Sequence, residues 1–253
     1  MPKPGRSIRP HPHHGRIQEA NWNSTIGIDV LMNRSLSRCP LCDSHEIALF
    51  FTSREKAGSR EFHHCAVCDL VFVPEGFHLD AAGQKARYLT HNNDPEDSGY
   101  RDFLSRLLDP LRPHLVPGSD GLDFGAGPGP ALAIMMREEG FRVRLFDPFF
   151  HPDVSVLGQD YDFITCTETA EHLAEPMREF QTLDRILKPA GWLGVMTGML
   201  ESWDDFANWY YHRDPTHICF YSRRTMEWIA GRFSWDVQFP RPNVVLFQKP
   251  GLA

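Results

Sequence analysis

A glycine-rich turn between an apolar segment and a helical pattern constrains the fold more than any other feature of the sequence. The apolar segment, residues 122–124, runs into Gly125, Gly127 and Gly129, and a helical pattern follows at once. This order predicts a strand, a tight turn and the start of a helix. Glycine reaches backbone angles that a side chain forbids, and it lets a ligand approach the backbone amides closely. We therefore expect a nucleotide-like ligand to bind at this turn.

The spacing of the glycines separates two kinds of nucleotide site. A dinucleotide site is typically built on G-x-G-x-x-G, but here the sixth position is Pro130 and the third glycine comes one residue early. The next apolar segment, residues 141–146, ends on Asp147. An acidic residue about 20 residues beyond such a turn can accept hydrogen bonds from ribose hydroxyls. An Asp-Pro pair also makes plain turns, but its register with the glycines favours the ligand role.

Strands and helices are predicted to alternate along the rest of the chain. An amphipathic helix over 100–111 precedes the first strand, and later strands are expected at 154–157, 161–167 and 192–197. Helices are expected at 176–187 and 222–230, and the segments 233–239 and 244–248 complete the sheet as a hairpin. Such alternation predicts an α/β fold with a mostly parallel sheet and helices on both faces.

Four of the six cysteines form two C-x-x-C pairs, Cys39 with Cys42 and Cys65 with Cys68. Each pair directs two thiolates to one point, and together they supply the four tetrahedral ligands of a structural Zn²⁺. Short strands between the pairs make the segment similar to a zinc ribbon. His63 or His64 could replace a cysteine, and a redox dithiol is the competing interpretation, which two matched pairs disfavour.

Composition limits the partners and divides the chain. The formal charge of −7 gives no long-range attraction to nucleic acid, so we expect a small-molecule substrate. Because there is no membrane-length apolar run and no secretory signal, a soluble, cytoplasmic protein is expected.

We divide the chain into a disordered tail (1–34), a zinc-ribbon-like module (35–75), a linker or lid (76–99) and a main domain (100–253). One hypothesis is that the native chain starts at Met32.

The main domain resembles the class I S-adenosylmethionine-dependent methyltransferases over about residues 100–249. The resemblance rests on G-x-G-x-G after a strand, on Asp147, and on the acidic loop Glu168-Thr-Ala-Glu171-His172-Leu173 after the fourth strand. It implies a Rossmann-like fold with a seven-stranded sheet in the order 3-2-1-4-5-7-6, with the last strand antiparallel. An N-terminal pair of C-x-x-C motifs ahead of such a domain is also similar to an arrangement found in bacterial methyltransferases.

The resemblance also implies roles for individual residues around S-adenosylmethionine. The three glycines would bring the backbone close to the cofactor, Asp147 would bind its ribose, and Asp123 with Glu168 would bind its amino-acid end. The other expected cofactor contacts are Phe124, Ala126, Pro148 and Thr167, with Tyr88 and Tyr100 from the lid region.

The acceptor side of the predicted site is less defined. An aromatic segment, residues 203–221, is expected to lie over the same sheet edge, with at least half of its rings in the core. Because imidazole accepts protons near neutral pH, His172 or His217 is the expected base, and His212 is a further histidine in this segment. The acceptor atom and the oligomeric state are not predicted.

Two other functions fit parts of the sequence. An NAD-dependent oxidoreductase would share the sheet and Asp147, although the early third glycine disfavours it. A non-catalytic protein that uses its zinc ribbon to bind nucleic acid or protein is the second alternative.

Overall fold

The computed structural model describes residues 38–55, 58–91 and 93–251, and these described residues belong to one compact unit. The predicted tail, residues 1–34, lies outside the described residues. Two sheets account for all the strands of the described part of the chain.

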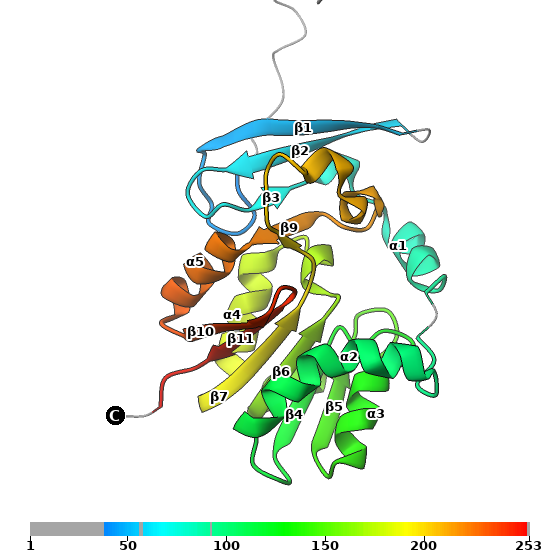
Figure 1. The fold of residues 1–253 in the computed structure, drawn as a ribbon, viewed down its shortest axis with the longest axis vertical. Helices are drawn as coiled ribbons and strands as arrows, with labels where there is room; N and C mark the ends of the chain where they lie inside the picture. Colours follow the sequence, from blue (N-terminus) through cyan, green and yellow to red (C-terminus); the bar gives the residue numbers. More distant parts are fainter. Residues whose placement is uncertain (1–37, 56–57, 92, 252–253) are drawn as a thin grey trace, which may run out of the picture. The chain divides into compact units, whose positions relative to one another are not determined.

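The larger sheet has the strand order β10-β11-β7-β6-β4-β5 (Figure 1). Its members are β4 (Asp120–Phe124), β5 (Arg142–Phe146), β6 (Tyr161–Thr167), β7 (Leu187–Met196), β10 (Asp236–Arg241) and β11 (Val244–Gln248). Strands β5, β4, β6 and β7 run parallel, and β11 pairs antiparallel with β7 and β10. This confirms a Rossmann-like α/β fold and the antiparallel last strand.

The prediction of a strand at residues 154–157 is wrong. This segment forms the 3-10 helix η3 (Val154–Gly158), so the sheet has six strands and β5 is its edge. The side chain of Asp153 accepts a hydrogen bond from the Ser155 amide, which caps the turn, and Val154 is 72% exposed. Val156 of this segment is buried in the core from the 3-10 turn, so the local side-chain cap is formed without loss of that contact.

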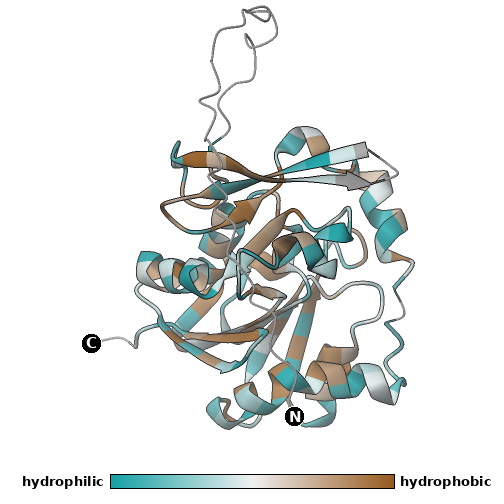
Figure 2. Ribbon diagram, turned by 45° about the horizontal axis from the view of Figure 1, so that its top comes forward, coloured by the Kyte–Doolittle hydropathy of each residue, from teal (hydrophilic) through white to brown (hydrophobic). Residues whose placement is uncertain are grey.

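Helices cover both faces of the larger sheet. Helices α2 (Ser98–Leu111) and α3 (Ala131–Glu138) pack on one face, and α4 (Pro176–Ile186) and α5 (Arg223–Phe233) on the other. Successive side chains of a strand point to opposite faces of the sheet, so each strand contributes to both cores. On β7, Leu193 packs on the α4–α5 side and Trp192 on the α2–α3 side. Figure 2 shows apolar residues along the strands and hydrophilic residues on outward parts of the helices.

The second sheet joins the cysteine-containing segment to the C-terminal half of the chain. Its order is β1-β2-β3-β9-β8, with β1 (Ile47–Glu55), β2 (Gly58–Cys65), β3 (Val71–Phe72), β8 (Met199–Leu200) and β9 (Cys219–Ser222). The central joint is the antiparallel pairing of β3 with β9, in which Val71 lies opposite Phe220. Most rings of the 203–221 segment therefore pack beneath the β1–β2 hairpin; Phe206, for example, lies 5.2 Å from Phe62.

Short helices make most of the remaining connections. They are α1 (Ala81–Tyr88) and the 3-10 helices η1 (Glu75–Phe77), η2 (Arg112–His114), η4 (Ala170–His172), η5 (Phe206–Asn208) and η6 (Tyr210–Arg213). Within the described residues, no helix combines the length and the apolar character that a membrane span requires.

Replacing Gly121 tests how tightly the first strand packs in the larger sheet. A Cβ at Gly121 would lie 2.1 Å from the ring of Phe163, so Gly121→Ala forces the ring or the strand to move. We expect the free energy of unfolding to fall by about 1–3 kcal/mol in chemical denaturation. Gly231→Ala is the matched control, because Gly231 lies in α5 with nothing within 4 Å of an added Cβ. A neutral Gly121→Ala change would contradict this packing.

Candidate functional site

A cavity of about 640 Å³ lies beyond the carboxyl ends of β4, β5 and β6. It is the position in which open α/β sheets bind ligands. The structure brings all the predicted cofactor contacts and both predicted bases to its wall. These residues are Tyr88, Tyr100, Asp123, Phe124, Gly125, Ala126, Gly127, Gly129, Asp147, Pro148, Thr167, Glu168, His172 and His217.

The glycine turn is shaped by neighbouring protein atoms as well as by its own backbone. Gly125 and Gly127 have φ angles of +81° and +63°, which favour glycine. A Cβ at Gly125 would lie 2.2 Å from Thr169, and one at Gly129 would lie 2.1 Å from the carbonyl oxygen of Asn93. The sequence explains these glycines by close approach of a ligand. At Gly125 and Gly129, however, an added Cβ would already collide with protein atoms. Thr169 and Asn93 both line the cavity and were not predicted.

Asp147 ties the second strand to the glycine turn. Its carboxylate accepts hydrogen bonds from the amides of Phe149 (2.8 Å), Phe150 (3.0 Å) and Gly127 (3.1 Å). A carboxylate offers about four acceptor positions, so one remains for a ligand hydroxyl. The side chain is therefore held in place before any ligand arrives.

Two further carboxyl groups lie at the same edge, Asp123 buried and Glu168 partly buried. Burial raises the pKa of Asp123 to about 6, although the Thr165 hydroxyl donates to it at 2.8 Å. Burial and then Glu171 raise the pKa of Glu168. Glu168 has a φ of +47°, and its amide donates to the Met196 carbonyl at 2.7 Å. Burial therefore disfavours the charged form of both carboxyl groups, and a cationic ligand beside them would favour it.

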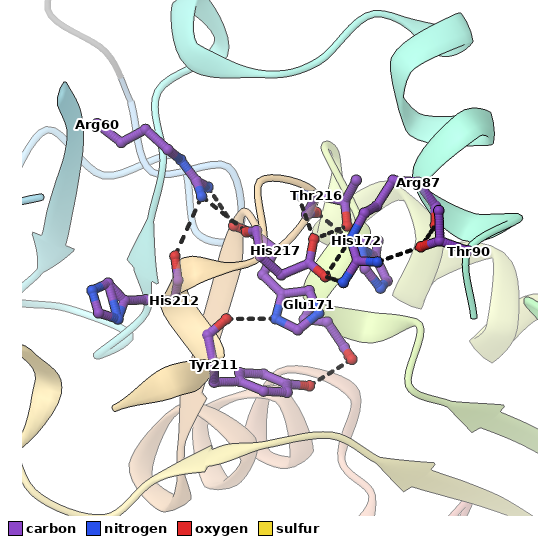
Figure 3. Close-up of polar contacts among 10 residues, drawn as sticks. Arg60, Arg87, Thr90, Glu171, His172, Tyr211, His212, Thr216 and His217 are labelled. Atoms are coloured by element: carbon purple, nitrogen blue, oxygen red, sulfur yellow. Dashed lines mark hydrogen bonds and ion pairs between the residues drawn. The ribbon is translucent and has the colours of Figure 1, made fainter. Parts of the chain in front are cut away.

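Glu171, His172 and His217 form a polar cluster at the other end of the cavity (Figure 3). Glu171 is fully buried and accepts hydrogen bonds from the hydroxyls of Tyr211 (2.5 Å) and Thr197 (2.7 Å). The two imidazole rings lie 4.8 Å apart. The Glu-His pair after β6 was noted in the sequence, but no role was predicted for Glu171.

The segment 76–99 closes one side of the cavity. Tyr88 of α1 lies against His172, with ring centres 5.1 Å apart, and against Phe149 at 5.7 Å. Arg87 of the same helix donates to Asp214 at 2.6 and 3.0 Å. Burial raises the pKa of Tyr88 above its usual value and that of Tyr100 to about 12. Both phenols therefore stay neutral hydrogen-bonding groups at physiological pH.

The aromatic segment 203–221 contributes less to this cavity than the sequence suggests. Of its members, His217 lines the cavity, whereas His212 is buried among Phe51, Phe62 and Phe206. Burial, first of all, lowers the pKa of His212 to about 4. His212 is therefore a core residue. Its burial was not evident from the sequence, because Phe51 and Phe62 come from a distant part of the chain.

The four predicted metal-binding cysteines lie together at the base of the β1–β2 hairpin. Their sulfur atoms all lie within 4.8 Å of one another, and none of the cysteines is in a disulfide. His63 and His64 are outside this group: they contact Glu61 at 3.4 Å and Asp69 at 3.1 Å, respectively. The arrangement gives four sulfur donors at one point, which matches a tetrahedral metal site.

The raised pKa of Asp123 predicts a pH dependence of stability. The unfolded carboxyl ionises at its ordinary pKa and the folded one at about 6, so stability is lost as pH rises through this range. Asp123→Asn removes this loss. We expect its unfolding free energy, relative to wild type, to rise by about 2–3 kcal/mol from pH 4 to pH 7 in denaturant titrations. Asp153→Asn, at an exposed carboxyl, should show no such rise; a flat difference for Asp123→Asn would contradict the burial argument.

Several solved structures are similar to this chain. A SAM-dependent methyltransferase from Archaeoglobus fulgidus has 15% identity and a TM-score of 0.48, over 67% of this chain and all of that one. Phosphoethanolamine N-methyltransferase 2 of Haemonchus contortus, in complex with S-adenosyl-L-methionine, has 14% identity and a TM-score of 0.45, over 79% and 71% of the two chains. A methyltransferase from Thermotoga maritima has 17% identity and a TM-score of 0.37, over 58% and 92%. No curated protein matches the chain.

A family model described as "Methyltransferase domain" matches residues 96–238, which is more than half of the chain. The matched region begins just before α2 and ends in β10, and it contains the glycine turn, Asp147 and the Glu171 loop. The chain therefore belongs to this methyltransferase family, which confirms the S-adenosylmethionine-dependent methyl transfer predicted from its sequence.

Proposed function

We propose that methyl transfer takes place in the 640 Å³ cavity, with S-adenosylmethionine across the glycine turn and a small-molecule acceptor beside Glu171. The observation that carries this proposal is the joint position of the glycine turn and the carboxylate of Asp147. This carboxylate is 8% exposed, fixed by three amides and open to a further hydrogen bond. The volume is in the range of sites that bind cofactor-sized ligands.

The residues at the cavity wall fit the chemistry of this cofactor. Asp147 would accept hydrogen bonds from the ribose, and the turn at Gly125–Gly129 lets the ligand approach its backbone. Asp123 and Glu168 would face the positively charged amino-acid end. Phe124, Ala126, Pro148 and Thr167 would enclose the remainder, with Tyr88 and Tyr100 closing the site from the segment before the first strand.

When bound, the cofactor supplies an electrophilic methyl group on a sulfonium. The chain must then hold the acceptor atom in line with that methyl and exclude water. A neutral or protonated acceptor also needs a group that takes up a proton. His172 and His217 are the proposed acceptors of this proton, because each presents one ring nitrogen without a hydrogen-bond partner among the described residues.

A small molecule suits this site better than a nucleic acid. The chain has a net charge of −7, which includes Asp123, Glu168 and Glu171 of the cavity wall. A phosphate backbone would gain no long-range attraction to such a chain. The cytoplasmic location expected from the composition stays a prediction.

An NAD-dependent oxidoreductase is the main rival for the same sheet. Its glycine spacing differs, and the family match favours methyl transfer. Thermal-shift titrations separate the two, because only a ligand that binds the native state raises the unfolding temperature. Stabilisation by NAD and not by S-adenosylmethionine would overturn the proposal.

We further propose that residues 35–75 are a zinc-stabilised module, that 76–99 is a lid and that 100–253 carries catalysis. Four sulfur atoms within 4.8 Å support the metal, since four thiolates would otherwise repel one another in a largely buried site. A closed shell of four thiolates leaves no position for a reacting water, so the role of this metal would be structural.

Asp147→Asn tests the cofactor site. We expect the dissociation constant for S-adenosylmethionine, measured by calorimetry, to rise about 10- to 100-fold, because a hydrogen bond to a charged group is lost. Asp160→Asn is the control, since this exposed side chain lies outside the cavity. Equal affinity in the two variants would remove Asp147 from the site.

Cys42→Ser tests the zinc module. We expect the purified variant to lose one equivalent of zinc in elemental analysis, because three thiolates do not close a tetrahedral shell. Its unfolding temperature should also fall, since metal binding contributes folding free energy. Cys166→Ala should keep the full zinc content, as Cys166 lies in β6, apart from the sulfur cluster. Unchanged zinc in Cys42→Ser would argue against this site.

A further inference from the structure

The orientation of two histidines in the cavity suggests more than proton transfer. The Nδ1 atom of His172 lies 2.9 Å from the Thr216 carbonyl oxygen, and Nδ1 of His217 lies 2.8 Å from the Tyr211 carbonyl oxygen. A carbonyl oxygen only accepts hydrogen bonds, so each Nδ1 must carry a hydrogen, and in the neutral ring each Nε2 then keeps a lone pair. Imidazoles that bind metal ions are typically held in this way, by a hydrogen bond from the other ring nitrogen.

Glu171 completes a set of ligand atoms around one point. One such atom from each of Glu171, His172 and His217 lies within 4.8 Å of the others. Ligands on one transition-metal ion are each about 2 Å from it, so they are at most roughly 4 Å apart. Small side-chain rotations would therefore bring the three onto a common ion. All three residues line the cavity, which leaves further coordination positions for a substrate.

The charge of Glu171 also calls for a cation. The residue is fully buried, and its hydrogen bonds come from the neutral hydroxyls of Tyr211 and Thr197. Among the described residues, no lysine or arginine forms an ion pair with it. A buried carboxylate without a compensating charge is costly, and a divalent ion would supply that charge.

We propose that Glu171, His172 and His217 bind one divalent transition-metal ion, which positions an oxygen of the methyl acceptor. This inference rests on the proposed methyl transfer and specifies its acceptor. The ion would occupy the free nitrogens of both imidazoles, so it would replace the proton-accepting role proposed for them above. Three protein ligands leave at least one open position, as in catalytic metal sites. A mixed set of two imidazoles and one carboxylate suits ions such as Mn²⁺ or Zn²⁺. The acceptor would be a hydroxyl compound, with a second oxygen next to the reacting one if two positions are open.

The reaction balances without any further reagent. The metal favours loss of the acceptor's hydroxyl proton, which passes to solvent. The oxygen lone pair forms the new O–CH₃ bond as the S–CH₃ bond breaks, and the electron pair of that bond stays on sulfur. The products are a methyl ether, a neutral thioether and one proton.

The cluster has two other possible roles. In one, His172 or His217 acts as a base with no metal; in the other, Glu171 only balances the positive charge of the cofactor. Neither account predicts metal binding that depends on all three side chains. Metal binding by the full-length, zinc-loaded chain therefore decides between them.

The experiment is a titration with Mn²⁺ alone, followed by electron paramagnetic resonance, in which free Mn²⁺ gives a sharp signal that is lost on binding. We expect one Mn²⁺ per wild-type chain, and enhanced relaxation of water protons from its open positions. His172→Ala and His217→Ala should each weaken Mn²⁺ binding at least about tenfold. Glu171→Gln keeps the size of the buried side chain but removes its charge, and it should weaken Mn²⁺ binding by a similar factor. His114→Ala, at the opposite end of the sheet, should not.

S-adenosylmethionine binding, measured by calorimetry on the same samples, separates failure of this inference from failure of the proposed function. Cofactor binding without Mn²⁺ binding would overturn the metal site and leave methyl transfer intact. Mn²⁺ binding that survives in all three cluster variants would overturn the assignment of its ligands. Mn²⁺ binding at the cluster without cofactor binding would support the site and overturn its role in methyl transfer. Unfolding temperatures of the variants check that they fold.

Discussion

The antiparallel pairing of β3 with β9 is the contact on which the arrangement of the cavity depends. β3 has only two residues, yet it joins the β1–β2 hairpin to the segment that carries His217. Arg60 of β2 extends this joint, because its guanidinium donates to the carbonyls of His212 (3.3 Å), Asp214 (2.9 Å) and His217 (2.6 Å). The N-terminal hairpin therefore fixes the backbone of a cavity residue more than 150 positions away in the chain.

Buried carboxyl groups at the sheet edge link this architecture to function. Asp123, Glu168 and Glu171 all line one cavity, and burial raises the pKa of the first two, so their charged forms are disfavoured in the empty cavity. Binding sites commonly carry titratable groups that are perturbed in this way. A sulfonium cofactor at the glycine turn and a divalent ion at Glu171 would each favour the charged carboxylates. An anionic dinucleotide such as NAD would bring no such positive charge to them.

The parts of this structure that sequence reasoning predicts are local. The glycine turn, Asp147 and the C-x-x-C pairs each lie within a few residues, where backbone chemistry decides the outcome. The strand prediction for residues 154–157 was wrong because the Asp153 side chain caps a 3-10 turn there, and the short apolar pattern did not reveal that cap. Asn93 and Thr169 could not be found, since their contacts with Gly129 and Gly125 depend on loops meeting in space. Short strands in the cysteine-containing segment were predicted and are present as β1 and β2. Their continuation through β3 to β9 and β8 was missed, because strands of two to four residues carry little periodic signal.

The cysteine cluster and the cavity are connected through one short path. Cys65 ends β2, and Asp69 follows it in the second C-x-x-C turn. Asp69 accepts a hydrogen bond at 2.5 Å from the hydroxyl of Ser222, which caps α5 and ends β9. β9 in turn begins two residues after His217. A metal that fixes the cysteine turns would therefore also fix the strand that leads out of the His217 loop. In this chain the cysteine turns and a cavity side chain are therefore joined through one strand, which gives the cysteine segment a structural connection to a domain whose motifs lie elsewhere.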